Sequence, residues 1–320
     1  MSKNDRRHFL KQFGTFAGCA LLAPGARSAG LFPAFPHGGF KLGAISDGLS
    51  EDFEEALKIM KSYGLKWVEV RSIWGIYNTE ASPAQIARVK ELLGQFDFRV
   101  SAVATAFYKC TLPGTKPVDE EKDVYPYAGQ MDLLQRAAER AQAWGTDKLR
   151  VFTFWRVAEP EKHYASIAEE MEKAGEFARG AGVRLVIENE GACNVGTGHE
   201  LARFLKMVRS TNVGANWDVG NGLWHGEIPY PDGYDALDKS RIWHMHVKGV
   251  ECDAGLKNCR ETFADQGQID LAGQFRALAH DGYDGTISLE CEFETPGLNH
   301  QQTTRRSMEG LLKVVAREKT

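Results

Sequence analysis

Eight short runs of apolar, β-prone residues alternate with longer segments that carry hydrophobic residues at helical spacing. Few hairpin-turn signals separate these runs, so consecutive strands are expected to be parallel and connected through helices. This alternation restricts the chain to α/β folds with a parallel sheet. The predicted strands cover residues 42–46, 67–71, 100–104, 149–154, 185–189, 213–218, 243–248 and 286–291.

Several segments between the strands have recognisable helix ends. Ser82 followed by Pro83 is a typical helix start, because proline lacks the N–H that a first helical residue leaves unpaired. Gly64, Gly145 and Gly182 stand where helix C-terminal caps are expected. The clearest helical patterns cover residues 53–63, 130–144 and 166–181, and one more begins at Pro83.

The number of strand–helix units favours a closed sheet. About 280 of the 320 residues follow residue 40, and a (β/α)8 barrel typically needs about 250 residues. An open doubly wound sheet is the alternative, but it would need a glycine-rich turn after the first strand, where residues 45–49 hold only Gly48. We therefore predict an α/β fold with a single (β/α)8 barrel, a closed parallel eight-stranded sheet, in residues 41–320.

Residues 1–28 have the pattern of an export signal. The Arg-Arg-x-Phe-Leu-Lys string of residues 6–11 resembles a twin-arginine signal, and a short apolar run at 13–23 follows it. This run is too short to cross a bilayer core of about 30 Å. We predict a signal peptide in 1–28, a linker in 29–40, export to the periplasm by the twin-arginine machinery, and no permanent membrane span.

Two other interpretations of this segment stay open. One is an amphipathic N-terminal helix with incidental basic residues, and the other is a lipid-anchored form attached through Cys19. Five cysteines follow the signal, so at least one thiol is free, and an oxidising compartment would allow Cys252 and Cys259 to close a short loop.

The charge of the chain argues against nucleic acid as a partner. The formal net charge is -4, and residues 1–28 hold five basic side chains against one acidic one. The rest therefore has 34 basic and 42 acidic side chains, a net charge of -8. Such a chain gains little from releasing counterions on DNA or RNA, and it has no basic stripe with interleaved aromatic residues.

The last four strands each carry side chains that can bind a metal ion. The fifth, sixth and eighth end at Glu188, Asp218 and Glu290, and the seventh carries His244 and His246 on the same side. Since all strands of a parallel barrel open onto one face at their carboxyl ends, these groups are expected to converge there. Each could separately be a helix cap or a core residue, but buried carboxylates on successive strands need a compensating cation. The pattern predicts one divalent metal site.

At these residues the chain resembles the xylose isomerase-like barrel family of sugar isomerases and epimerases. The resemblance extends from about residue 41 to the C-terminal helix, and its specific motifs lie in the last four strands. The matching strings are Ile187-Glu188-Asn189, Trp217-Asp218-Val219-Gly220-Asn221, His244-Met245-His246-Val247-Lys248, and Gly282-Tyr283-Asp284-Gly285 leading to Ser288-Leu289-Glu290.

The resemblance implies the ligands Glu188, Asp218, His246 and Glu290, with His246 chosen over His244 by its place in the motif. It also implies that Glu188 and Glu290 are the acid/base pair. The ligand set favours Mn2+, with Mg2+, Co2+ or Zn2+ as alternatives. An ion there would polarise a sugar carbonyl and acidify the neighbouring C–H, and two carboxylates would move the proton through an enediolate.

We expect further side chains to bind the substrate. The family often orients its substrate from the end of the second strand, where an internal ion pair is the other interpretation of Glu69 and Arg71. Lys248 lies two residues beyond His246, and Trp155 would supply a stacking surface. The full expected set is Glu69, Arg71, Asn189, Asn221, His244, Lys248, Arg260 and Trp155.

The chain departs from the family at Asn221, where many relatives have histidine. An amide is a poor metal ligand and cannot act as an acid or base, so the substrates of the relatives cannot be assigned to this chain. A DNA-repair branch of the superfamily binds three zinc ions and needs several more histidines. The ends of the third and fourth predicted strands hold no histidine, which argues against that branch. The last loop holds Glu292 and Glu294, which would repel a phosphate.

The leading hypothesis is a metal-dependent isomerase or epimerase that acts on an unphosphorylated sugar or keto-sugar. The first alternative is a metal-dependent lyase or dehydratase that acts on oxidised sugars, glycosides or inositols. The second is a non-catalytic periplasmic sugar-binding barrel. A small sugar is the expected partner in each case, and an oligomer stays open.

Overall fold

The computed structural model describes residues 40–256 and 258–317. The predicted signal peptide and residues 29–39 of the predicted linker lie outside this part of the chain, so the export prediction stays a prediction. Among the described residues, no helix has the length and apolar character needed to cross a membrane.

Eight parallel strands form the central sheet, in the order β1-β12-β9-β8-β7-β6-β5-β2. A parallel bridge between Ile45 and Glu69, just after β1 and within β2, brings the two ends of this order together. The predicted barrel with a parallel eight-stranded sheet is therefore confirmed. Its strands are β1 (Lys41–Ala44), β2 (Trp67–Val70), β5 (Arg99–Ala104), β6 (Lys148–Val151), β7 (Arg184–Glu188), β8 (Val213–Asp218), β9 (Ile242–Val247) and β12 (Thr286–Leu289).

Four strands, β1, β2, β6 and β12, are shorter than the sequence predicts, and β6 and β12 end early because the chain leaves the sheet to build loops at the carboxyl ends. β6 ends at Val151, and the backbone N–H of Phe152 donates to the carbonyl of Phe107 in another loop. β12 ends at Leu289, although the N–H of Glu290 still donates to the carbonyl of Val247. Apolar composition alone does not distinguish these loop residues from strand residues.

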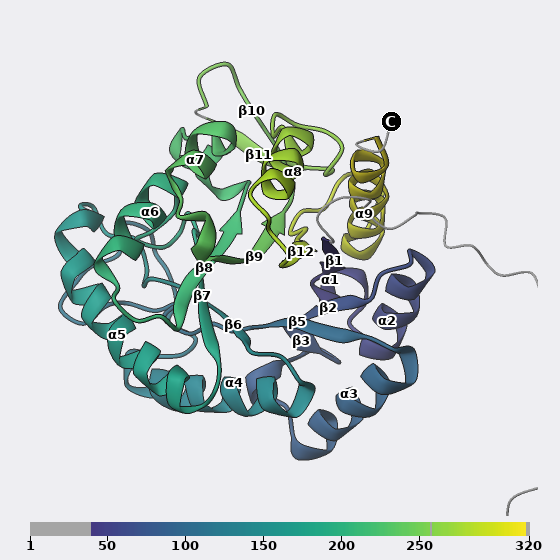
Figure 1. Cartoon of the computed structure of the whole chain (residues 1–320), viewed down its shortest axis with the longest axis horizontal. Helices are drawn as coiled ribbons and strands as arrows, with labels where there is room; N and C mark the ends of the chain where they lie inside the picture. Colours follow the sequence, from purple (N-terminus) through teal and green to yellow (C-terminus); the bar gives the residue numbers. More distant parts are fainter. Residues whose placement is uncertain (1–39, 257, 318–320) are drawn as a thin grey trace, which may run out of the picture.

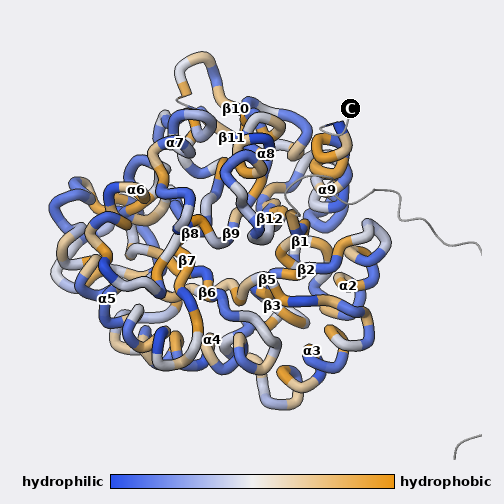
Figure 2. The backbone as a smooth tube through the Cα atoms, viewed as in Figure 1, coloured by the Kyte–Doolittle hydropathy of each residue, from blue (hydrophilic) through white to orange (hydrophobic). Residues whose placement is uncertain are grey.

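Helices surround the strands on the outside of the barrel (Figure 1). Ser82 and Gln85 form a capping box at the start of α3, and Gly145 ends α4 with φ of 75°. Hydrophobic and hydrophilic residues alternate along these helices, as Figure 2 shows, because one side of each packs on the sheet. The main helices are α2 (Phe53–Ser62), α3 (Pro83–Phe96), α4 (Gln130–Trp144), α5 (Tyr164–Gly180), α6 (Gly198–Met207), α8 (Leu271–His280) and α9 (His300–Arg317).

Short elements extend the connections that follow the strands. A hairpin of β3 (Ser72–Ile73) and β4 (Ile76–Tyr77) follows β2, and the 3-10 helix η4 (Asn221–His225) follows β8. A second hairpin, β10 (Gly249–Cys252) and β11 (Cys259–Thr262), follows β9. Two short α-helices are α1 (Ser46–Leu49) and α7 (Tyr234–Ala236), and further short helices are η1 (Asn78–Glu80), η2 (Tyr127–Gly129), η3 (Pro160–His163), η5 (Pro229–Gly233) and η6 (Lys239–Arg241).

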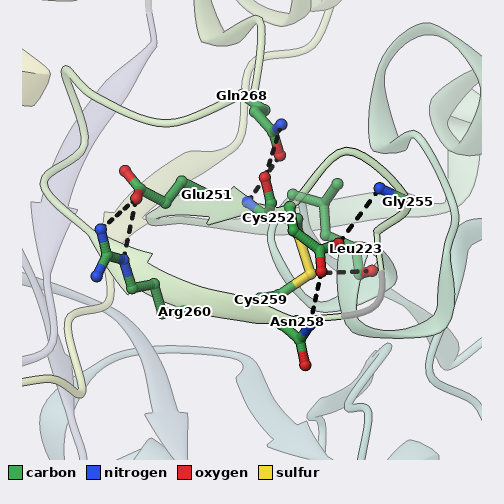
Figure 3. The surroundings of a disulfide bond; sticks show 9 residues. Leu223, Glu251, Cys252, Gly255, Asn258, Cys259, Arg260 and Gln268 are labelled. Carbon is green, nitrogen blue, oxygen red and sulfur yellow. Dashed lines mark hydrogen bonds and ion pairs between the residues drawn. A yellow bond between two sulfur atoms is a disulfide. The ribbon is translucent and has the colours of Figure 1, made fainter.

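A disulfide between Cys252 and Cys259 closes the second hairpin (Figure 3). This is the pairing that the sequence allows. Cys110, Cys193 and Cys291 are free and buried.

Candidate metal centre

The structure brings Glu188, Asp218, His246 and Glu290 together in one buried cluster. One ligand atom from each of the four lies within 4.8 Å of the others. Strand register explains this convergence, because Asp218 at the end of β8 pairs with His246 on β9, and His246 pairs with Ser288 on β12. Two residues after Ser288 comes Glu290, and β7 ends at Glu188. The four side chains therefore reach the same level of the barrel mouth.

The geometry of this cluster fits a divalent cation. His246 Nδ1 lies 3.4 Å from a Glu290 oxygen, 3.7 Å from a Glu188 oxygen and 3.9 Å from Asp218 Oδ2. His246 Nδ1 is buried and has no hydrogen-bond partner among the described residues, and the buried Asp218 Oδ2 contacts Lys248 Nζ at 3.1 Å without forming a further hydrogen bond there. Leaving a buried polar atom unpaired costs about 1–3 kcal/mol. A cation among three carboxylates and one imidazole would bind both atoms and reduce the repulsion between the acids.

The other carboxylate oxygen of Asp218, Oδ1, is held by backbone hydrogen bonds, and this orients Oδ2 toward the cluster. Asp218 Oδ1 accepts hydrogen bonds from the backbone N–H groups of Gly220 and Asn221, at 2.7 and 2.9 Å. Asn189 fixes the same strand end, since its amide donates to the Asp218 carbonyl and accepts from the Asp218 N–H, both at 2.9 Å. Asn189 is one of the predicted substrate-binding residues, and in the structure its amide connects β7 to β8.

Glu69 and His244 are also among the predicted substrate-binding residues, and the structure places Glu69 in contact with His244 and His246. Both are fully buried, and Glu69 Oε2 lies 2.8 Å from His244 Nε2 and 2.9 Å from His246 Nε2. This contact leaves His246 Nδ1 facing the carboxylates, as carboxylate partners of metal-binding histidines commonly do. Burial opposes ionisation of Glu69, but the two imidazoles outweigh it and hold its pKa well below the usual range.

Arg150 on β6 is a part of the site that the sequence reasoning missed. Its guanidinium lies 2.9 Å from Glu188 and 3.7 Å from Glu290. Burial and the nearby Glu290 carboxylate oppose ionisation of Glu188, but Arg150 and His246 outweigh them and lower its pKa. A charged residue within an otherwise apolar strand was the available signal, because a buried arginine needs an anionic partner.

Lys248 and Arg71 add further positive charge around the cluster. Lys248 Nζ lies 2.8 Å from Glu290 and 3.1 Å from Asp218 Oδ2. Burial opposes ionisation of Glu290, yet Lys248 and His246 hold its pKa well below the usual range. Arg71 lies 3.8 Å from Glu290 and also pairs with Asp47 in α1 and with Glu292 in the loop after β12. Both residues were predicted, and both are within reach of the cluster.

Asn221 lies between Glu188 and Lys248 and contacts both. Its amide N–H donates to Glu188 at 3.3 Å, and its oxygen accepts from Lys248 at 3.3 Å. Asn221 therefore orients one proposed ligand and one cation without needing to bind a metal itself.

Two predicted substrate residues have partners elsewhere. Trp155 is buried, and its indole N–H donates to Asp123 at 2.8 Å. Arg260 pairs with Glu251 across the hairpin (Figure 3), and its side chain is 77% exposed. Within the described residues, no hydrogen bond or ion pair joins either side chain to the four-residue cluster.

A pocket with a cavity volume of about 360 Å³ opens beside the cluster. Asn221 and Lys248 line the pocket and contact Glu188 and Glu290 of the cluster, so the pocket adjoins the cluster. The pocket is lined by Asp119, Glu190, Gly191, Ala192, Asn221, Trp224, His225, Lys248, Glu261 and Glu292.

Comparison with known proteins identifies the family. Residues 57–314 match the family model described as xylose isomerase-like TIM barrel. Inosose dehydratase of Lacticaseibacillus casei is 26% identical over 269 residues, which cover 77% of this chain and 84% of the relative.

Two solved structures share the fold at lower sequence identity. One, IOLI protein with a bound zinc atom, has a TM-score of 0.67 and 17% identity, covering 87% of this chain and 99% of the other. The second, D-allulose 3-epimerase from Methylomonas sp. in complex with D-allulose, has a TM-score of 0.61 and 18% identity, covering 88% and 99%. Because the family model matches most of the chain, the chain belongs to the xylose isomerase-like TIM barrel family.

Proposed function

We propose that the chain is a divalent-metal-dependent enzyme that removes a proton from the carbon next to a carbonyl in an unphosphorylated sugar or keto-sugar. If the proton is returned to the neighbouring carbon, the enzyme is an isomerase. If it is returned to the same carbon on the opposite face, the enzyme is an epimerase. The observation that carries this proposal is the buried cluster of Glu188, Asp218, His246 and Glu290, in which His246 Nδ1 is buried without a hydrogen-bond partner among the described residues.

A cation held by these four residues, Mn2+ being our first choice, would polarise the substrate carbonyl and acidify the adjacent C–H. Glu188 and Glu290 are the proposed acid/base pair. Glu188 ends β7 and Glu290 follows β12, and β8 and β9 lie between these strands in the sheet. The two carboxylates therefore approach the centre from different directions, as removing and returning a proton on different sides of an enediolate requires.

Each proposed base has its own cation. Arg150 contacts Glu188 at 2.9 Å and Lys248 contacts Glu290 at 2.8 Å, which keeps both carboxylates ionised and ready to accept a proton. Arginine side chains stay protonated in proteins, so Arg150 orients Glu188 without exchanging a proton. The ammonium group of Lys248 also lines the pocket, so a substrate oxygen can accept its N–H in place of the Asn221 oxygen at 3.3 Å.

Export to the periplasm remains part of the proposal. Support comes from the Cys252–Cys259 disulfide, because such bridges persist in oxidising compartments. The predicted preference for an unphosphorylated substrate is supported by the carboxylates of Glu261 and Glu292 in the pocket wall.

A dehydratase is the second candidate, and the similarity to inosose dehydratase of Lacticaseibacillus casei favours it. The first step is the same, since a β-hydroxyl leaves only after the proton next to the carbonyl is removed. The carboxylic acid formed when Glu188 or Glu290 takes up that proton would then protonate the β-hydroxyl, so that it leaves as water, and Lys248 would orient it by hydrogen bonding.

Proton exchange in deuterated water tests both candidates. Protein purified without chelator is analysed for metal and then incubated with ketohexoses and cyclic polyol ketones, and the products are identified by NMR. An isomerase or epimerase gives a deuterated isomer, whereas a dehydratase gives a product that has lost water. Glu290→Gln should abolish exchange, while the matched control Glu294→Gln, on an exposed side chain, should keep it. Sugar binding without proton exchange in the metal-loaded protein would instead identify a binding protein.

A further inference from the structure

We propose that the pocket beside the metal centre is a subsite for an uncharged second ring of the substrate, so that the preferred substrate is a neutral glycoside. This inference rests on the proposed function, because it assigns the reacting ring to the metal centre. Three features of the pocket carry it: its connection to the cluster, its exposed tryptophan and its acidic lining.

The pocket continues directly from the cluster. Lys248 and Asn221 line it, and the same two side chains contact Glu290 and Glu188. Its volume of about 360 Å³ lies within the range of roughly 300–1,000 Å³ that is usual for small-molecule sites. A substrate whose reacting carbon lies at the cluster can therefore place a second ring in this space.

Trp224 gives the pocket an aromatic wall. It is 40% exposed, whereas Trp155 and Trp217 are buried. The apolar C–H face of a sugar ring covers an indole well, and burying that surface is favourable. An aromatic residue next to a few polar groups is the usual composition of a site that binds an uncharged polar ligand.

The residues on both sides of Trp224 are anchored, so the indole is part of a fixed surface. His225 Nε2 lies 3.0 Å from the carbonyl oxygen of Gly191, in the loop after β7. The carbonyl oxygen of Leu223 lies 3.5 Å from the sulfur of Cys259 in the disulfide-closed hairpin (Figure 3). Two loops thus hold η4 in place, and a ligand loses less entropy when its contact surface is already ordered.

Four carboxylates determine which ligands the pocket accepts. Glu190 lies 3.4 Å from Lys109, and Glu292 lies 2.5 Å from Arg71, so these two acids are paired. The other two, Asp119 and Glu261, have no cation within 4 Å in the described part of the chain. The remaining negative charge repels a phosphate or a sugar acid. Carboxylate oxygens accept hydrogen bonds from neighbouring hydroxyls, so a neutral polyhydroxylated ring suits the pocket.

Three probes that share one ketose test the subsite: D-fructose, maltulose and fructose 6-phosphate. Maltulose adds a neutral ring to the ketose, and fructose 6-phosphate adds an anion. Binding to the metal-loaded full chain is measured by calorimetry, and deuterium incorporation is measured in parallel. We expect maltulose to bind at least about tenfold tighter than D-fructose, and fructose 6-phosphate to bind weakest.

Variants separate the subsite from the metal centre. Trp224→Ala should weaken maltulose binding by about tenfold and leave D-fructose binding unchanged, whereas Trp224→Phe should retain most of the preference. Replacing Glu190 and Glu261 with glutamine should improve binding of fructose 6-phosphate, and the exposed control Glu91→Gln should not.

The outcomes distinguish the two proposals. Maltulose that binds no better than D-fructose, or a Trp224→Ala variant that affects both sugars equally, overturns the subsite and leaves the proposed function standing. A metal-loaded protein that exchanges no proton with any ketose or cyclic polyol ketone overturns the proposed function, whatever the pocket binds.

Discussion

Replacing Glu69 with glutamine tests how the site orients its histidine. Glu69 is fully buried, and one of its oxygens contacts both His244 and His246. Glutamine has nearly the same shape and can still accept from both rings, so the change mainly removes the negative charge. A hydrogen bond to a charged group contributes about 1.5–3 kcal/mol and a neutral one about 0.5–1.5 kcal/mol. The loss is therefore about 1 kcal/mol for each imidazole.

The two contacts give two separate expectations. The free energy of unfolding of the metal-free protein should fall by about 2 kcal/mol, because both hydrogen bonds weaken. Metal affinity should fall by about fivefold through the His246 bond alone, since 1.4 kcal/mol corresponds to a factor of ten. Changes to residues that orient metal-binding histidines reach about 100-fold, which sets the upper end of the expected range.

Competition with a fluorescent chelator measures the affinity for Mn2+ and Zn2+, and urea unfolding measures stability. Glu80→Gln is the matched control, because Glu80 pairs with Arg136 at the surface and its side chain is 48% exposed. The control should change neither quantity. If folded Glu69→Gln protein binds both metals as tightly as the unchanged protein, Glu69 does not orient His246 for metal binding.

Three further predictions concern charge and covalent links. Cys259→Ser should lower stability by about 2 kcal/mol, as expected for opening a short loop, and reductant should then have no further effect on urea unfolding. Arg150→Met should destabilise the metal-free protein by about 3–5 kcal/mol and raise the pKa of Glu188, which NMR titration would detect. Although burial opposes its ionisation, Glu200 has a pKa held below the ordinary value of 4.5, by Arg156 among others. Its stabilisation is complete above that value and is lost as the pH falls through the lower folded pKa, so Glu200→Gln should flatten the acid limb of stability against pH.

The positions of the proposed metal ligands could be predicted because each depends on a local pattern and one rule of topology. Glu188 and Asp218 each end their own strand, and parallel strands end on the same face. Helix ends were predictable for a similar reason, since Ser82 and Gly145 act within one turn of the chain. The choice between His244 and His246 needed the resemblance to a family, because alternation puts both on the same side.

The role of Glu69 could not be predicted in this way. It is 175 residues from His244, and β1 and β12 lie between β2 and β9 in the closed sheet order. Their side chains meet inside the barrel, so the contact depends on closure and not on neighbouring strands. Arg150 is an intermediate case. Its position in an apolar strand signalled a buried partner, but the identity of that partner, Glu188, required the structure.

Asn221 shows why the chemistry was easier to predict than the substrate. Its amide donates to Glu188 and accepts from Lys248, so a single side chain links the cluster to the pocket. A neutral histidine at this position could also donate one hydrogen bond and accept another. Its two ring nitrogens, however, are separated by a rigid ring, whereas the NH2 group and the oxygen of the Asn221 amide are bonded to the same carbon. Asn221→His should therefore break one of the two contacts, leaving Glu188 with Arg150 or Lys248 with its carboxylate partners. The proposed substrate choice thus depends on loop residues that no strand pattern reveals, whereas Glu188 and Asp218 follow from the ends of their own strands.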